Sequence, residues 1–225
     1  MKLAVIALAL LALISTTWAQ TSGADKTAAF DKLADQYFHD VYYRFIPTQV
    51  TAAGFHEVDG QLENYSRASI NQQISVLNAQ KRLFEAVNPA QLSQRAAADR
   101  ELVLGDINSK LLTLENIRPW EKNPDFYSSN VTGSIFVIMA RTFAPAPERL
   151  KSAIAREKQI PAVFDAARQN LKNPPPIYVD VALEQLPGIV SFFQKDVPEA
   201  FKSVTDPALL QQFHSSNQAV IASLQ

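Results

Sequence analysis

Residues 179–197 read VDVALEQLPGIVSFFQKDV, and this stretch carries the most regular hydrophobic pattern in the chain. Its apolar residues recur at intervals of 4, 3, 4, 3 and 4, at Val179, Leu183, Leu186, Val190, Phe193 and Val197. An α-helix has 3.6 residues per turn, so these intervals place the six side chains on one face. The pattern predicts an amphipathic helix that buries this face against its neighbours and bends at Pro187.

Five further segments show helical spacing of their apolar residues, and one more, residues 131–140, is short and apolar. Together these segments cover residues 30–45, 70–87, 103–117, 131–140, 150–171 and 207–224. The stripe over 103–117 is the other strong one and is also expected to be buried. No segment alternates with a period of two for long enough to indicate a sheet. The sequence therefore predicts an all-α fold, a multi-helix bundle of about seven helices with proline kinks.

Proline and its neighbours mark the predicted helix ends. Pro47, Pro89 and Pro119 follow the first three of the further segments, where a helix cannot easily continue. Pro161 lies inside residues 150–171 and predicts a kink or a break there. Asp206 before Pro207 is typical of an N-cap that opens the last helix.

Composition excludes several functional classes. The 225 residues hold 21 Lys and Arg against 22 Asp and Glu, a net charge of -1, which argues against nucleic-acid binding. A hydrophobic share of 47% with 19% charged residues argues against a disordered chain. The six glycines form no G-x-G, so nucleotide-binding glycine loops are excluded. The absence of cysteine excludes disulfides, iron–sulfur clusters and cysteine zinc sites.

The first residues are typical of an export signal. Lys2 precedes an apolar run over residues 3–14, which is too short to span a bilayer as a helix. The small residues Thr17 and Ala19 predict cleavage before Gln20. The mature protein is then expected to be periplasmic or secreted, with no membrane attachment. An uncleaved anchor is the alternative, and the lack of cysteine excludes a lipobox.

No catalytic residue is predicted from local motifs. The three histidines are His39, His56 and His214, and no two of them lie one helical turn apart as zinc ligands of a peptidase would. Glu57 follows His56, but Gly60 stands where the second histidine of such a motif is needed. Gly-x-Ser-x-Gly is also absent.

Three non-periodic stretches carry more polar and aromatic side chains than a connector needs, and one of them, residues 170–176, is predicted to be a plain linker. In residues 54–62, His56 and Asp59 either line a substrate cleft or serve a helix-to-helix loop in which Asp59 bonds its own backbone and His56 packs. In residues 118–127, Trp120 and Tyr127 either face the same cleft or anchor the turn between two helices. Arg118 either faces the cleft or bonds the carbonyls of the preceding helix.

Several motifs together resemble a known bacterial family. They lie at residues 51–56, 59–62, 117–121, 123–124, 143–145, 148–150, 170–175 and 182–185. In this order they resemble the N-terminal half of the family called domain of unknown function 885. The resemblance implies a longer, exported or lipid-anchored helical protein, similar to zinc-dependent peptidases of the zincin type, with a His-Glu-x-x-Pro-Gly-His motif in the half that follows.

The resemblance also sets the expected domain organisation. Residues 1–19 are expected to be the signal peptide and 20–225 a helical N-terminal domain of a zincin-like protein, incomplete at its C-terminus because the apolar period still runs at Leu224. It implies no cofactor or metal site in this chain, zinc in the full-length parent, and a peptide or small-molecule substrate there.

Two functions remain open. The chain is either one wall or lid of the substrate cleft of that parent, without catalytic residues of its own, or a non-catalytic periplasmic helical module for binding or scaffolding.

Overall fold

The computed structural model describes residues 26–225, and this part of the chain contains helices and no strand. The predicted all-α class is therefore confirmed, while the predicted signal peptide lies outside the described residues. After helical residues 26–45, which include the π-helical turn η1 (Phe38–Tyr43), the elements are α2 (Pro47–Ala52), α3 (Arg67–Ala86), η2 (Pro89–Gln91), α4 (Gln94–Leu111), η3 (Leu112–Ile117), α5 (Pro119–Lys122), α6 (Asp125–Ala140), α7 (Ala146–Glu157), α8 (Ile160–Asn170), α9 (Pro176–Ser191), η4 (Phe192–Asp196), α10 (Val197–Ala200) and α11 (Pro207–Leu224).

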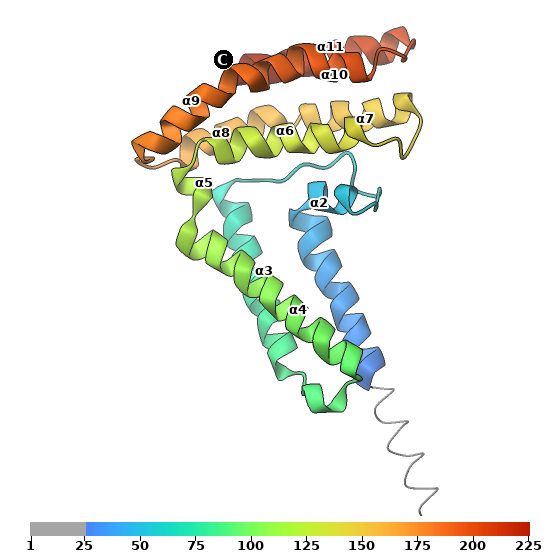
Figure 1. Ribbon diagram of the computed structural model, residues 1–225, viewed down its shortest axis with the longest axis vertical. Coiled ribbons are helices and arrows are strands. Elements are labelled where there is room, and N and C mark those ends of the chain that lie inside the picture. Colours follow the sequence, from blue (N-terminus) through green and yellow to red (C-terminus); the bar gives the residue numbers. More distant parts are fainter. Residues whose placement is uncertain (1–25) are drawn as a thin grey trace, which may run out of the picture.

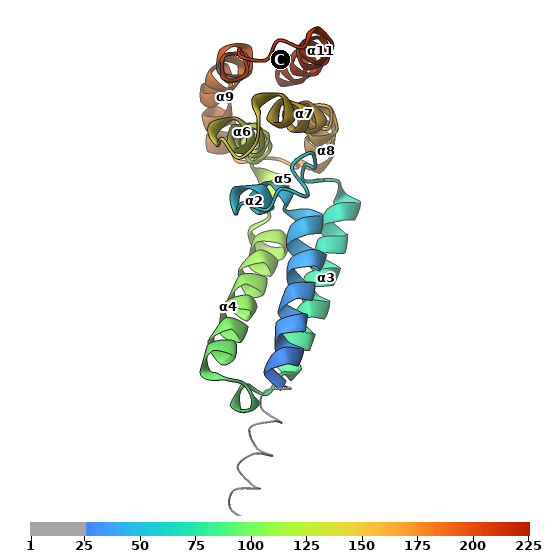
Figure 2. The same cartoon turned by 90° about the vertical axis from the view of Figure 1, so that its right-hand side faces the viewer.

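The helices form a long lower part and a layered upper part (Figure 1). In the lower part, residues 26–45, α3 and α4 run side by side as three long helices (Figure 2). The upper part stacks α6, α7 and α8 beneath α9, α10 and α11. The short helices α2 and α5 lie where the two parts meet.

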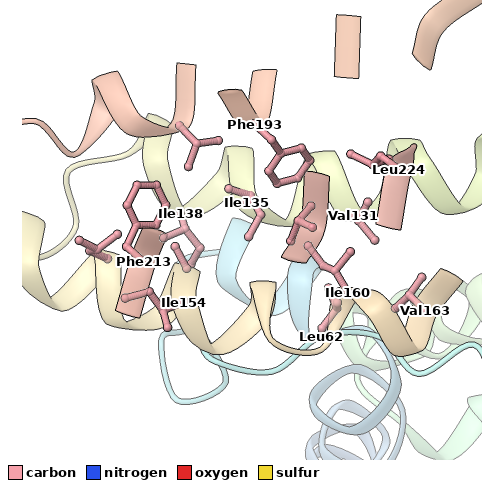
Figure 3. Packing of buried hydrophobic residues seen from close by; sticks show 14 of the residues in the cluster. Leu62, Val131, Ile135, Ile138, Ile154, Ile160, Val163, Phe193, Phe213 and Leu224 are labelled. Atoms are coloured by element: carbon pink, nitrogen blue, oxygen red, sulfur yellow. The ribbon is translucent and has the colours of Figure 1, made fainter. Parts of the chain in front are cut away.

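Each part has its own hydrophobic core. Side chains from α6, α7, α8, η4 and α11 meet in the upper core (Figure 3). The lower core joins Phe30 and Tyr37 to Leu77 and Phe84 of α3 and to Ile107 of α4. Partly buried Ile74 and Leu114 pack against both cores, so the two parts share apolar contacts at their junction.

The predicted helix ends agree with the structure. The Asp206 carboxylate accepts hydrogen bonds from the backbone N–H groups of Ala208 and Leu209, as an N-cap does. The segment with Pro161 is broken rather than kinked, because α7 ends at Glu157 and Pro161 lies in the first turn of α8. Pro187 lies inside α9, and the bend expected there stays a prediction.

The predicted burial of the opening stripe is correct at its end and wrong at Leu183. Leu186 and Val190 of α9 are partly buried and pack against the upper core. Phe193 and Val197 beyond the helix are buried, but no residue of α9 itself is. Leu183 of the stripe is 61% exposed, and beside it Ile177 and Tyr178 are 62% and 43% exposed. The physical reason is position: α9 lies at the edge of the upper part and contacts α6 and α11, so no other described element covers its outer side.

The other strong stripe is buried over most of its length. Val103, Ile107 and Leu111 are buried in the lower core. Ile117 at its end is 54% exposed, because η3 leads away from that core toward α5. The prediction for residues 103–117 is therefore correct as far as Leu111, in part at the half-buried Leu114, and wrong at Ile117.

Candidate functional site

The polar stretch after α2 starts with a sharp change of direction at Gly54. Gly54 has φ +96°, in the left-handed region that glycine adopts without strain. Its N–H donates to the Thr51 carbonyl at 3.0 Å, which closes the end of α2. The loop then runs back beneath α7. A Cβ atom at Gly60 would lie only 3.3 Å from the Ala155 Cβ, so the loop backbone passes close to α7 at this glycine.

His56 and Asp59 interact directly within this loop. His56 Nδ1 lies 3.0 Å from Asp59 Oδ2, and the imidazole stacks on the Phe143 ring with centroids 4.0 Å apart. The Asp59 carboxylate also accepts a 2.7 Å hydrogen bond from Thr51 Oγ1. Asp59 is 7% exposed, and it bonds α2 and the imidazole rather than its own backbone. The carboxylate therefore fixes the imidazole ring in place over Phe143.

A buried arginine holds this loop against the upper core. Arg156 of α7 has no exposed surface, and its three nitrogens donate to the Asp59 carbonyl, the Ser134 carbonyl and Thr51 Oγ1, each at 2.7 Å. Burial lowers the pKa of Arg156, and the nearby carboxylates of Glu63 and Asp59 act in the opposite direction. Its guanidinium is the centre that joins α2, the loop, α6 and α7.

The loop and the α6–α7 connection together form a polar pocket of about 330 Å³. It is lined by His56, Glu57, Asp59, Gly60, Phe143, Ala144, Glu148 and Ser152. The pocket offers one imidazole, several carboxylates and a flat aromatic surface, which suits recognition of a polar ligand.

The pocket does not fit a zinc ion. Zinc in proteins takes at least three protein ligands. No group of three or more His, Cys, Asp or Glu side chains that could hold a metal occurs among residues 26–225. His56 and Asp59 supply a pair only, so no metal-dependent step is assigned to these residues.

The second candidate group lies where α5 meets α6. Trp120 is 3% exposed and its Nε1 donates to the Leu114 carbonyl at 2.9 Å. Tyr127 is 1% exposed; its hydroxyl donates to the Trp120 carbonyl and accepts from Asn170 Nδ2 at 3.1 Å. Both side chains are used inside the fold, so the structure supports the anchoring alternative for them.

Arg118 departs from the expected helix-capping contact. Its backbone adopts φ 54°, and its guanidinium pairs with Glu121 rather than with carbonyls of the preceding helix. It lies 5.6 Å from the Trp120 ring centroid, and Arg67 lies 4.2 Å from the same ring. The left-handed turn at Arg118 sends the chain into α5 and leaves the guanidinium partly exposed.

The structure does not bring all five predicted residues together. Trp120 of α5 and Tyr127 lie near the start of α6, whereas His56 stacks on Phe143 just beyond its end. The 16 residues of α6 span roughly 24 Å at 1.5 Å per residue. The candidates therefore form two groups at opposite ends of one helix.

Sequence reasoning missed Arg156 and Glu157. Arginine and glutamate are usually exposed, and their position in a helix of mixed composition gives no sign that both are buried. Phe143 was identifiable only as part of a family motif.

Fold and pocket together define an all-helical protein domain with a polar pocket whose loop is held by a buried arginine. The chain belongs to the family described as bacterial protein of unknown function (DUF885), whose model matches residues 47–225. No curated protein matches it.

A solved structure from Shewanella oneidensis resembles this one, with a TM-score of 0.75 and 25% sequence identity. That protein has unknown function and is described provisionally as a lipoprotein. The match covers 90% of this chain and 36% of the other, so the chain spans about a third of that protein's length. Within residues 26–225 of our chain, no helix is both long and apolar enough to cross a membrane.

Proposed function

We propose that this chain is the N-terminal helical region of an exported, zinc-dependent peptidase-like hydrolase, where it forms one wall or lid of the substrate cleft. In this proposal the zinc and the catalytic residues belong to a further part of the family fold. His56, Asp59 and Arg118 remain the side chains proposed to face the cleft. A peptide or small molecule is the proposed substrate class, and the periplasm or the exterior is the proposed location.

The observation that carries the proposal is the uncovered apolar side of α9. Leu183 and Leu186 line a groove of about 240 Å³ together with Phe164, Leu171 and Leu224, and the atoms that line it are mostly apolar. Exposed apolar surface that is contiguous is typical of a surface that another protein part covers. The solved structure from Shewanella oneidensis is nearly three times as long as the part matched here, so that protein has further chain beyond the matched part.

The polar pocket supports the cleft-wall role. His56 and Asp59 are held by the Arg156 network, so their positions need no ordering when a ligand arrives. The likeness to zinc peptidases rests on the motifs of the sequence, and the described residues supply no metal ligands of their own.

The alternative is a helical module that binds or scaffolds without chemistry. The same apolar side of α9 would then contact a separate protein. The gene sequence beyond codon 225 distinguishes the two: a continuing frame with His-Glu-x-x-x-x-His supports the cleft wall, and a stop codon supports the module.

A substitution on α9 tests whether another part of the full-length protein packs on its apolar side. Leu183→Glu keeps helix propensity close to that of leucine. In residues 20–225 alone it should change the free energy of unfolding by less than about 0.5 kcal/mol, because Leu183 is 61% exposed. In a protein extended through the complete family fold it should cost about 3 kcal/mol or more, because the charge would be buried without a partner. Urea unfolding of both proteins measures the difference.

Leu102→Glu is the matched control. Leu102 is 71% exposed on α4, in the lower part, so the change should be near neutral in both proteins. An equally small effect of Leu183→Glu in the extended protein would show that α9 is not covered, and the proposal would fail.

A further inference from the structure

A second pocket, of about 490 Å³, lies between helical residues 26–45 and α2. Its walls include the rings of Phe38, Tyr42, Tyr43 and Phe55, with Asp35 and His39 beside them. It is separate from the pocket at Asp59 and plays no part in the function proposed above.

The backbone builds this pocket by two departures from regular helix. The π-helical turn η1 (Phe38–Tyr43) widens the helix, and such turns are frequent at functional sites. Ile46, with φ -135° and ψ 50°, then stops the helix, and Pro47 starts α2 in a new direction. Gln49 and Val50 of α2, and Ala53 just after it, consequently face the aromatic side chains of the turn.

The aromatic walls are held by contacts to other rings and to α4. Phe38 and Tyr42 have centroids 5.3 Å apart, and Tyr43 and Phe55 have centroids 6.4 Å apart. The Tyr42 hydroxyl bonds Asp106 at 3.0 Å and Lys110 at 3.0 Å, which fixes its ring. Phe38 and Phe55 are 46% and 54% exposed, so each presents an apolar ring surface to solvent.

The charge around the pocket is negative. Asp35 lines it, no lysine or arginine does, and Asp35 makes no ion pair among residues 26–225. The Lys110 ammonium pairs with Asp106 and lies 4.5 Å from the centroid of the Tyr42 ring, so a cation already occupies a face of that ring. Aromatic ring faces attract cations, and a carboxylate at the rim adds to that attraction.

We propose that this pocket binds a flat apolar group that carries a protonated amine. The rings of Phe38, Tyr43 and Phe55 would contact the flat group, and Asp35 would pair with the ammonium. Either a free aromatic amine or the amino-terminal aromatic residue of a peptide has this chemistry.

Three probes test the proposal. They share a phenyl ring and carry a positive charge, no charge or a negative charge. The purified chain is titrated with 2-phenylethylamine, 2-phenylethanol and 3-phenylpropionate, and binding is followed by amide chemical shifts in NMR. The amine should bind about 3- to 10-fold more tightly than the alcohol, and the carboxylate should bind most weakly. Equal affinity for the three probes, or no saturable binding of the amine, would overturn the proposal.

Peptide probes distinguish the two sources of the ligand. Phe-Ala-Ala binding more tightly than 2-phenylethylamine would assign the pocket to a peptide amino terminus, and weaker binding would assign it to a free amine. N-acetyl-Phe-Ala-Ala lacks the ammonium and should bind more weakly than the unblocked peptide.

Three variants locate the binding. Phe55→Ala should weaken amine binding about 5-fold, because it removes apolar contact area at the rim. Asp35→Asn should remove the preference for the amine over the alcohol. Phe136→Ala, which truncates an equally exposed ring on α6, should leave binding unchanged. Unchanged amine binding in Phe55→Ala would place the ligand elsewhere and contradict the assignment.

Discussion

Arg156→Ala is expected to lower the free energy of unfolding by about 3–5 kcal/mol, the range for removing one member of a buried charged network. The truncation leaves the carbonyls of Asp59 and Ser134 and the Thr51 hydroxyl without their donor in a buried site. Each unsatisfied group costs about 1–3 kcal/mol. Because small proteins are stable by only about 5–15 kcal/mol, urea unfolding should show a large fall in midpoint.

Two further variants separate the network from general effects of losing an arginine. Arg156→Lys keeps the charge but places one ammonium where three nitrogens donate in different directions, so about 2 kcal/mol should be lost. Arg168→Ala removes an exposed arginine paired with Asp165 and should cost less than about 1 kcal/mol. If Arg156→Ala cost no more than Arg168→Ala, the network would have no structural role.

The second large effect expected is a fall in stability between mildly acidic and neutral pH, caused by Glu157. Its carboxylate is buried between α7 and α11, where Ser216 and Asn217 donate hydrogen bonds to it. Burial raises the pKa of Glu157 from 4.5 to about 7, against the effect of these two donors. The folded state therefore holds this proton more tightly than the unfolded state does.

The raised pKa of Glu157 determines that the free energy of unfolding falls as the pH rises. The stabilisation from the protonated carboxyl is complete below about pH 4.5 and is lost as the pH rises through about 7. The shift corresponds to about 3 kcal/mol, at 1.36 kcal/mol per pH unit. Urea unfolding at pH 5 and pH 8 should show this loss in the unchanged protein and much less of it in Glu157→Gln.

Glu115→Gln is the matched control because Glu115 is exposed on η3. It should keep the pH dependence of the unchanged protein. A pH dependence equally strong in Glu157→Gln would show that other groups cause the effect.

Helices were predictable because their apolar residues repeat every three or four positions. The break near Pro161 and the cap at Asp206 followed from local backbone chemistry. Whether a side chain of a stripe is covered depends on its neighbours in space, and for this reason Leu183 was expected to be buried but is exposed. The π-helical turns also have no sequence signal of this kind.

The candidate site was predictable in part. Residues 54–62 were predicted as a candidate site because His56 and Asp59 stand between two glycines. The structure brings these two side chains into contact. Trp120 and Tyr127 were predicted as candidates because their stretch is rich in polar and aromatic residues. Both side chains instead donate hydrogen bonds to backbone carbonyls within the fold. Arg156 could not be predicted, because its three acceptors come from residues far from it in the chain.

Zinc content tests the proposed division between a helical wall and a metal-bearing remainder most directly. Purified residues 20–225 and a protein extended through the complete family fold are dialysed, and their zinc is measured by mass spectrometry alongside peptide hydrolysis. We expect no stoichiometric zinc and no hydrolysis in residues 20–225, and one zinc per chain with hydrolysis in the extended protein. One tightly held zinc in residues 20–225, or none in the extended protein, would contradict the proposed function.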